Sequence, residues 1–414
     1  MLKRFRIRVY TLLDFIASIY DYQVNPYGRG SSPHGRLTNL SDSTERHTYR
    51  PPAEKPPERI AIFVAYSERL THSNRAYIKT LKQSGFSILY INNSLTDKHD
   101  HEEVLQLCWR AFDRKNIGRD FGAFKDAVLL LHSEGHLHQC ELLCIANDSM
   151  QFIPGRYADD LIKRINTFSK SSSKGLFSHA SHQIETHYQS YFQILKPAIF
   201  RSKLFIEFWQ DYVPLSNRIH CIRKGEIALS SKVYRRFQPV EVLYRSDALV
   251  SILSELRKND EGVSGEEILG MIPSPTRTLE KTPQAVYALE QIIGKSHRRE
   301  MLSAQQFYNI ADLIENSNPS HVAAFLYPFF LHCPFIKHDL CSAGSFTAAQ
   351  AIYLYEEALK SSSGQVLTQK LLESFVDEFK QLVDFKGTPL SYSNKLKEAT
   401  TKGVANGFIY SRVC

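Results

Sequence analysis

The sequence lacks the motifs that usually assign a function by themselves. None of its apolar runs approaches the roughly 20 residues of a membrane-spanning helix, so we expect a chain that does not span a membrane. It carries no G-x-G-x-x-G dinucleotide fingerprint, no G-x-x-x-x-G-K-[ST] phosphate loop and no nucleophile-elbow pattern. Any nucleotide site must therefore be built in another way.

Disulfide, zinc and nucleic-acid patterns are also missing. The seven cysteines are odd in number and scattered, without a C-x-x-C pair, which predicts reduced core residues of a cytosolic protein. The histidines of "TDKHDHEE" and "HSEGHLHQ" have no compact zinc spacing, which favours solvated surface turns. A net charge of +8 suggests an anionic partner, but the basic residues form no stripe interleaved with aromatics. We expect no nucleic-acid partner.

Positive charge is concentrated at the N-terminus. Residues 1–24 open with four basic side chains among the first eight and continue with apolar residues that Asp14 interrupts, which argues against a secretory signal. We predict a basic amphipathic helix on an anionic membrane surface, and a first helix packed on the folded body fits the periodicity equally well. Residues 25–58, rich in Gly, Ser and Pro, predict a disordered linker.

Strands and helices alternate from residue 59 onward. The apolar runs 59–66 and 86–94 predict buried strands, and the helical stretch between them ends at Gly85, a typical C-cap position. This order predicts parallel strands covered on both faces. A predicted helix over 101–112 and a predicted buried strand over 141–149 continue the alternation.

We therefore predict an α/β fold with a mostly parallel sheet in a domain over 59–250. A helical region over 251–414 follows, because apolar residues recur there at helical spacing.

Polar residues stand where the predicted strands end. Ligands of parallel sheets bind at the carboxyl ends of the strands. The residues that this rule selects are Tyr66, Ser67, Asn92, Asn93, Ser94, Asn147, Asp148 and Ser149.

The stretch "KNIGRDFGAF" (115–124) leads into an apolar helical face. Asn116, Gly118 and Gly122 allow a tight turn and a close approach of the backbone to a ligand. The start of the helix offers N–H groups to an anion, and Arg119 adds a positive charge. Asp120 fits two roles, an acceptor for ribose or sugar hydroxyls and a helix N-cap.

The stretch "CIANDSMQF" turns polar at Asn147 and Asp148. Carboxylate and amide oxygens at that point suit a divalent cation, Mg²⁺ or Mn²⁺, that bridges two phosphates. Only one of the two residues is an acid, so the pattern is thinner than a paired Asp-x-Asp. A turn in which Asp148 and Ser149 satisfy local backbone groups fits equally well.

Seven stretches in order resemble the rhamnan synthesis protein F family of bacterial polysaccharide glycosyltransferases. They span about residues 59 to 340 and are "FVAYSE", "LKQSGFSILYINNS", "RKNIGRDFGAFKDAV", "ANDSM", "HYQSYFQILKPAIFRSKLFIEFW", "IRKGEIALSSKV" and "NPSHVAAFLYPFFLHCPFIKHDL". The chain departs from the family pattern at Ala180 and Ser181, where an Asp-Ser pair is expected.

The resemblance implies a GT-A-like (Rossmann-type) enzyme. It would transfer a sugar, rhamnose or another deoxyhexose, from a nucleotide donor such as dTDP-rhamnose to a lipid-linked glycan of a cell-surface polysaccharide or lipopolysaccharide. The protein would work in the cytoplasm, peripheral to the inner face of the plasma membrane. An inactive glycosyltransferase-like scaffold or glycan-binding subunit is the alternative, because the motif at residues 147 and 148 holds a single acid.

The resemblance also implies roles for the selected residues. The nucleoside pocket would be lined by Tyr66, Asn92 and Asn93. Arg119 and Asp120 would meet the ribose and the phosphates, together with the loop residues Asn116 and Gly118 and the strand-end residue Asn147. Asp148 would hold the cation, and Lys337 would stand near the diphosphate.

Three residues outside the nucleotide half are candidates for catalysis. A general base must take the proton of the attacking hydroxyl. Glu226 in "RKGEIALS" is the first candidate and Glu185 the second, and a charge that stabilises the first turn of a helix is the other role for Glu226. His187 lies in an alternating aromatic stretch that predicts a half-buried strand beside the acceptor, and a core histidine is its alternative.

Overall fold

A computed structural model of the 414-residue chain forms two compact units. The structure describes residues 12, 15–16, 19–20, 38–39, 57–183, 185–258, 265–272, 304–338, 340, 346, 348–363, 369 and 371–377. The first unit takes its described residues from segments 1–148, 164–178 and 186–242. The second unit takes them from segments 149–163, 179–185 and 243–414.

The first unit is built on an eight-stranded sheet with the order β1-β4-β3-β2-β5-β10-β7-β11. Its strands are β1 (Thr38–Asn39), β2 (Arg59–Ala65), β3 (Ser87–Asn92), β4 (Arg110–Asp113), β5 (Leu142–Asn147), β7 (Gly175–Phe177), β10 (Phe192–Leu195) and β11 (Glu241–Val242). The central neighbours β4, β3, β2 and β5 run parallel, whereas β10 is antiparallel to both β5 and β7. The predicted α/β fold with a mostly parallel central sheet is confirmed.

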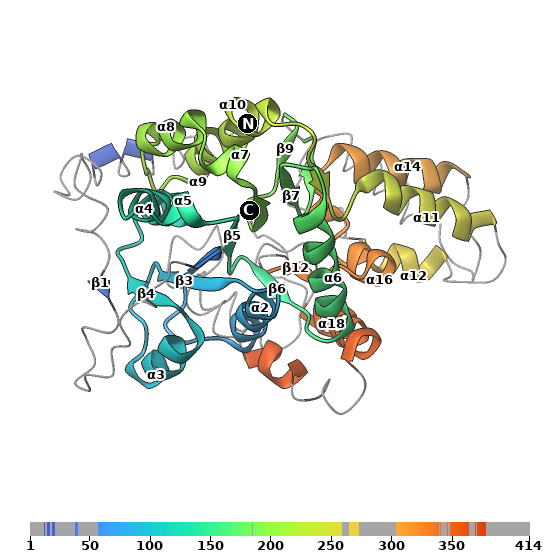
Figure 1. The fold of residues 1–414 in the computed structure, drawn as a ribbon. Coiled ribbons are helices and arrows are strands. Elements are labelled where there is room, and N and C mark those ends of the chain that lie inside the picture. The colour runs from blue at the N-terminus through green and yellow to red at the C-terminus, as the bar shows by residue number, and fades with distance from the viewer. Residues whose placement is uncertain are drawn as a thin grey trace. The chain divides into compact units, whose positions relative to one another are not determined.

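Helices cover both faces of this sheet. In the first unit they are α2 (His72–Gln83), α3 (Lys98–Leu107), α4 (Arg119–Ser133), α5 (His136–Gln139), α7 (Pro197–Phe200), α8 (Lys203–Asp211), α9 (Arg218–His220), the π-helix η3 (Cys221–Ile227), α10 (Ala228–Lys232) and the 3₁₀ helix η4 (Tyr234–Arg236). Figure 1 shows α4 and α8 on one side of the central strands and α2 and α3 on the other.

The ends of α2 follow from local chemistry. The Thr71 hydroxyl accepts the N–H of Asn74 over 3.1 Å and caps the helix start. After the helix, Gly85 adopts a φ of 85°, a left-handed conformation that glycine enters without a steric penalty. The predicted strand, helix, strand order is confirmed here.

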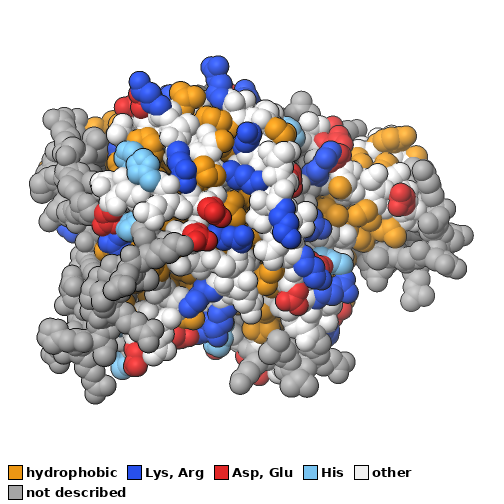
Figure 2. All heavy atoms as spheres, viewed as in Figure 1, with side chains coloured by type: hydrophobic (Ala, Val, Ile, Leu, Met, Phe, Trp, Pro, Cys, Tyr) orange, Lys and Arg blue, Asp and Glu red, His pale blue; other side chains and the backbone are white. Residues whose placement is uncertain are grey.

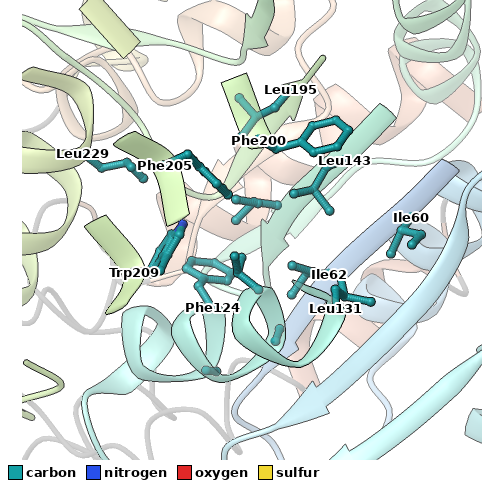
Figure 3. Close-up of a cluster of buried hydrophobic side chains, with 14 of the residues drawn as sticks. Ile60, Ile62, Phe124, Leu131, Leu143, Leu195, Phe200, Phe205, Trp209 and Leu229 are labelled. Atoms are coloured by element: carbon teal, nitrogen blue, oxygen red, sulfur yellow. The ribbon is translucent and has the colours of Figure 1, made fainter. Parts of the chain in front are cut away.

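The main core lies between the sheet and the layer of α4, α7 and α8. Ile60 and Ile62 of β2 face this layer, and Phe124 of α4 meets Trp209 of α8 edge to face at 6.4 Å (Figure 3). On the other face of β2, Phe63 contacts Tyr77 of α2 at 5.3 Å. Because both faces are covered, β2 is buried from its second residue to its last.

The second unit is mostly helical where the structure describes it. Its strands β6 (Met150–Phe152) and β12 (Phe335–Lys337) pair antiparallel, with Lys337 opposite Met150. Its helices are α11 (Ser246–Lys258), α12 (Gly265–Gly270), α14 (Ala304–Asn316), α15 (Pro319–Val322), α16 (Leu326–Leu331) and α18 (Ala348–Ser363). Three elements remain. Helix α6 (Arg156–Lys170) contributes residues to both units, the short strand β8 (Ala180–Ser181) belongs to the second unit, and the short strand β9 (His187–Tyr188) belongs to the first.

The predicted helix over 101–112 is wrong in its second half. Helix α3 ends at Leu107, and Arg110–Asp113 forms the strand β4. The aromatic and apolar residues of this short run pack beside β3, and sheet pairing overrides the helical periodicity.

Much of the predicted N-terminal helix and linker lies outside the described residues. Leu12, Phe15, Ile16 and Tyr20 are helical and at least 38% exposed, and membrane contact by this helix stays a prediction. Within the predicted linker, Thr38–Asn39 forms β1 and pairs with β4 at the edge of the sheet. In the part of the chain that the structure describes, no helix is long and apolar enough to cross a bilayer.

Candidate active site

The strand order of the first unit reverses between β2 and β5. From β2 the chain adds β3 and then β4 on one side, whereas β5 and then β10 lie on the other side. In open α/β sheets the ligand crevice lies at such a reversal, beyond the carboxyl ends of the strands. Here the Tyr66 N–H donates to Oδ2 of Asp148 over 2.7 Å. Tyr66 is half-buried and Asp148 is buried. The two predicted strand-end residues therefore meet at the reversal point.

Asp148 does not serve as a local turn residue in this bond. The partner of its carboxylate lies 82 residues away in the chain, at the end of β2. Its own N–H donates to the carbonyl of Val64 over 3.0 Å, which continues the pairing of β5 with β2. Through Oδ2 the carboxylate therefore ties two strands together.

Asp120 and Asn147 also meet at this edge. Asn147 Nδ2 donates to Oδ2 of Asp120 over 2.8 Å. The N-cap of α4 is Gly118, which makes no side-chain cap bond, so Asp120 as the N-cap is wrong. The Asp120 carboxylate lies in the first turn of α4, where the helix dipole favours a negative charge.

Two glycines permit the tight path of the loop into α4. Gly118 has a φ of 76°, and a Cβ there would lie 2.5 Å from Cβ of Pro214. A Cβ on Gly122 would lie 2.0 Å from the carbonyl oxygen of Ile117. Both glycines therefore allow close approaches within the protein, and an approach of this backbone to a ligand stays a prediction.

Ser216 holds this loop from the neighbouring segment. Its hydroxyl accepts the Gly118 N–H over 3.1 Å, and its carbonyl accepts Nε–H of Arg119 over 2.7 Å. Arg119 is exposed and has a φ of 53°, a rare conformation for a residue with a side chain. Strained residues of this kind cluster at functional sites, and the surrounding contacts must hold them in place.

Arg114 is a buried anchor that sequence reasoning missed. Its side chain is 1% exposed and pairs with the 4% exposed carboxylate of Asp126 at 3.0 Å. It also donates to Oδ1 of Asn93 over 2.5 Å and to the carbonyl of Ile117 over 2.9 Å. One guanidinium thus links the end of β3, the loop and α4. The sequence predicted a helix over 101–112 and no strand end before residue 114. Arg114 was therefore not selected, although it directly follows β4.

Asn92 and Asn93 differ in what they bind. Both polar atoms of Asn92 are used by the protein: Nδ2 donates to the Ser67 carbonyl and the Thr96 hydroxyl, and Oδ1 accepts the Ser94 N–H. The Asn92 side chain therefore links the segment after β2 to the segment after β3 and does not face a ligand. Among the described residues, the buried Nδ2 of Asn93 and the buried Oδ1 of Asn116 have no hydrogen-bond partner.

Such orphaned atoms are rare in folded proteins and call for an explanation. Asn93 follows the end of β3 and Asn116 lies in the loop, so one amide donor and one amide acceptor of this region are unsatisfied.

Glu226 lies in the π-helix η3, which continues from α9. The sequence predicted that Glu226 opens a helix, but the helical segment begins before it. The predicted role of Glu226 as a charge in the first turn is therefore wrong. Its Oε1 accepts the Ser190 N–H over 2.7 Å, and its Oε2 lies 3.6 Å from Nε2 of His187. His187 is 3% exposed and begins the short strand β9 (His187–Tyr188). The structure brings two of the three predicted catalytic residues together.

The segment of Ser190 and Tyr191, which contacts Glu226, also contacts the end of β5. The carbonyl of Tyr191, next to Ser190, accepts the Asn147 N–H over 3.3 Å. Three of the selected residues belong to the second unit: Ser149, the exposed Glu185 and the half-buried Lys337.

Gly225 sets how η3 packs on α4. A Cβ at Gly225 would lie 2.7 Å from the ring of Phe121. That ring is stacked on Trp209 at 6.0 Å and touches Tyr212, so it has no room to retreat. The glycine directly before Glu226 therefore lets the π-helix approach the first turn of α4. π-Helical turns occur frequently at functional sites.

The thiol of Cys221 contacts the carbonyl of Gly118 in the loop at 3.7 Å, and it is not a candidate nucleophile. Its thiol donates to the carbonyl of Leu215 over 3.3 Å and is buried. Burial raises the pKa of Cys221 to about 11, so the thiol stays protonated at neutral pH. The five described cysteines are all free.

A preformed metal centre is absent from the described residues, because no three His, Cys, Asp or Glu side chains gather there. The protein offers the Asp148 carboxylate beside Asn147, with one Asp148 oxygen already bonded to Tyr66. Mg²⁺ commonly takes one or two carboxylates together with substrate phosphates. The residues fit a cation that arrives with a diphosphate, and they do not fit a metal site built from protein ligands alone.

Comparison with known proteins supports the resemblance seen in the sequence. A curated relative, "Uncharacterized protein y4gN" of Sinorhizobium fredii (strain NBRC 101917 / NGR234), is 27% identical over 200 residues, which is 48% of this chain. The match covers 51% of the relative, so the chain spans about half the length of the curated protein it matches. No solved structure matches. Residues 88–245, which hold most of the candidate site, match the family model "Rhamnan synthesis protein F", and the predicted family resemblance is confirmed over that range.

Proposed function

We propose that the chain is a glycosyltransferase of polysaccharide synthesis. It moves a sugar, rhamnose or another deoxyhexose, from a nucleotide donor such as dTDP-rhamnose to a growing lipid-linked glycan of the cell surface. The observation that carries the proposal is the meeting of Tyr66 and Asp148 at the strand-order reversal. Asp148 itself lies in residues 88–245, which match a rhamnan synthesis family. In this proposal the first unit is a GT-A-like nucleotide-sugar domain.

The donor lies along the carboxyl ends of β2, β3 and β5. Asn93 and Asn116 offer the orphaned amide donor and acceptor to its polar edge. The first turn of α4 faces the diphosphate with its N–H groups, and Arg119 adds a full positive charge. Asp120, held by Asn147, accepts from ribose or sugar hydroxyls.

A divalent cation, Mg²⁺ or Mn²⁺, bound at Asp148 would neutralise the charge of the departing diphosphate. Asp148 and Asn147 are the residues that would hold it.

Glu226 acts as the general base. It takes the proton of the acceptor hydroxyl while the hydroxyl oxygen attacks the anomeric carbon, and the bond from that carbon to the donor phosphate breaks with release of the nucleoside diphosphate. The Ser190 N–H fixes one oxygen of the carboxylate, and the nearby imidazole of His187 orients the other. Glu185 is the second candidate for this base.

The proposal also covers the acceptor and the contact of the protein with the membrane. The acceptor is a lipid-linked glycan, and the N-terminal helix rests on the anionic inner face of the plasma membrane. Lys337 of β12 remains a candidate contact for the diphosphate.

A second candidate function is a glycan-binding scaffold without catalysis. The single acid at Asn147 and Asp148 is the observation that favours it. The test is incubation of the purified chain with a panel of nucleotide sugars and a water-soluble glycan acceptor. Release of nucleoside diphosphate that depends on the acceptor supports the enzyme. Acceptor binding without release from any donor supports the scaffold.

A further inference from the structure

A short surface of the first unit combines positive charge with exposed aliphatic side chains. We define the α9–η3 surface as Val213, Arg218, Ile219, Arg223 and Lys224. Val213 is 38% and Ile219 45% exposed, and the three basic residues are exposed as well. Asp and Glu do not occur between Tyr212 and Gly225. The stretch therefore presents cations and aliphatic groups without a neutralising acid of its own.

The charge of this region is large relative to the whole chain. Between Arg201 and Arg236 there are eight Lys or Arg and three Asp or Glu, a net charge of +5, whereas the complete chain has +8. In Figure 2, Lys and Arg side chains gather with hydrophobic ones over α8, α9 and α10. The excess positive charge of the protein is thus concentrated here as well as at the N-terminus.

Contacts hold the members of the surface together. Nε2 of His220 bonds to the carbonyl of Val213 over 2.8 Å, which places Val213 against α9. Burial, and secondly the nearby charge of Lys224, lower the pKa of His220, while the bond to Val213 opposes the shift. Ile219 and Arg223 are four residues apart, a spacing that brings them to one side of the helical segment. The lowered pKa favours the neutral imidazole, and Lys and Arg supply the charge of the surface.

We propose that the α9–η3 surface docks on an anionic phospholipid bilayer. Cationic side chains gain energy close to anionic headgroups, and exposed aliphatic side chains gain energy by entering the headgroup boundary. The docking is separate from any contact of the N-terminal helix. It goes beyond the proposed sugar transfer, and it places the segment that carries Glu226 next to the plane where a lipid-linked acceptor lies.

Vesicle flotation with the full chain tests this surface. The probes are vesicles of phosphatidylcholine alone and of phosphatidylcholine mixed with phosphatidylglycerol. The variant Arg218→Gln/Arg223→Gln/Lys224→Gln removes three charges, and each Lys or Arg near an anionic surface contributes roughly fivefold in binding, on the order of 100-fold for three. The matched control, Lys79→Gln/Lys82→Gln/Lys98→Gln, removes three exposed charges from α2 and α3.

The apolar contribution of the N-terminal helix is removed by repeating each measurement with Leu12→Ser/Phe15→Ser/Ile16→Ser. In both backgrounds we expect selective binding to vesicles with phosphatidylglycerol, a loss on the order of 100-fold for the α9–η3 variant and little loss for the control. Equal losses for the two charge variants, or undiminished binding of the α9–η3 variant, would overturn the proposal.

The aliphatic part of the surface separates a bilayer from a soluble polyanion. Val213→Ser/Ile219→Ser should weaken vesicle binding several-fold while binding of soluble polyphosphate is unchanged. If this variant binds vesicles as the parent does, the surface recognises polyanions in general and the proposal is wrong. Vesicle binding is read without any transfer reaction. A chain that binds vesicles but transfers no sugar contradicts the proposed function alone.

Discussion

The backbone N–H of Tyr66 donates to Oδ2 of Asp148 over 2.7 Å, and this bond joins the ends of β2 and β5. The carboxylate therefore has a structural partner in addition to any ligand. Removal of the carboxylate takes this acceptor from the N–H of the half-buried Tyr66. A substitution at this position must keep an acceptor if it is to test chemistry alone.

Asp148→Asn should abolish transfer while the melting temperature stays near that of the parent. The Asn side-chain oxygen can still accept the Tyr66 N–H, but the negative charge that would hold a cation is gone. Asp148→Ala should lose about 1–3 kcal/mol of stability as well, because the N–H is then unsatisfied. Turnover with a nucleotide sugar and thermal unfolding of both variants check this expectation.

Chelation gives the control for the same residue. EDTA should stop the parent enzyme, and added Mg²⁺ or Mn²⁺ should restore it. Full activity in EDTA, or normal turnover of Asp148→Asn, would remove the metal role. Arg119 and the first turn of α4 would then have to stabilise the leaving diphosphate.

Glu226→Gln should reduce turnover by roughly 10² to 10⁴ with little change in donor affinity, since a base acts mainly in the transition state. The amide oxygen of Gln can keep the bond from the Ser190 N–H, so the fold should be unaffected. Donor binding, melting temperature and turnover are measured on one preparation. Near-normal turnover would pass the assignment to Glu185, and the same substitution at Glu185 serves as the matched comparison.

The strand ends of the nucleotide half could be predicted from the sequence. Strands such as β2 and β5 are buried on both faces, so they read as apolar runs, and the first polar residues after them mark the carboxyl edge. Asp148 and Asn147 were found in this way. The partners of these residues could not be found, because Tyr66 and Asp148 are 82 positions apart and only the sheet order brings them together.

The residues that hold the loop before α4 could not be predicted from the sequence. Ser216 bonds to Gly118 across 98 positions, and a serine in a loop has no pattern that signals such a contact. Arg114 follows a strand of only four residues, which helical periodicity masked. Glycine was the one useful signal, since Gly118 and Gly122 both mark close backbone approaches.

The buried pair of Arg114 and Asp126 should be a main support of the loop. Asp126→Asn leaves the guanidinium without its counter-charge at a site where both side chains are nearly inaccessible, and a cost of about 3–5 kcal/mol in the free energy of unfolding is expected. Arg114→Met/Asp126→Leu should recover much of that stability. Urea unfolding of the three proteins measures the effect.

Activity distinguishes the pair's two roles. The double variant should remain poorly active although it folds, because the bonds from Arg114 to Asn93 and Ile117 are lost with the guanidinium. A stable double variant with full activity would mean that the loop needs no anchor from Arg114.

Cys221 should be almost inert to iodoacetamide near neutral pH. Its folded-state pKa of about 11 lies above the ordinary thiol value, so little thiolate exists and reactivity should rise as pH increases toward 11. Mass spectrometry of alkylated peptides follows this residue separately from the other cysteines. Cys221→Ala should keep turnover, and a large loss with an intact fold would contradict the view that the thiol takes no part in catalysis.

Gly225→Ala should displace η3 from the first turn of α4. The new Cβ would lie 2.7 Å from the Phe121 ring, which Trp209 and Tyr212 hold in place. Overpacking of this kind costs about 1–3 kcal/mol in the free energy of unfolding, and it should also lower turnover because Glu226 is the next residue. Thermal unfolding and turnover are measured on the same variant.

The second substitution Phe121→Leu makes room for that Cβ and isolates the cause. The double variant should be more stable than the sum of the two single losses predicts, since the clash exists only when the alanine and the ring are both present. Turnover should recover with stability if η3 carries the base. Recovered stability without recovered turnover would mean that the packing of η3 on Phe121 does not position Glu226, and the base would then have to be sought elsewhere.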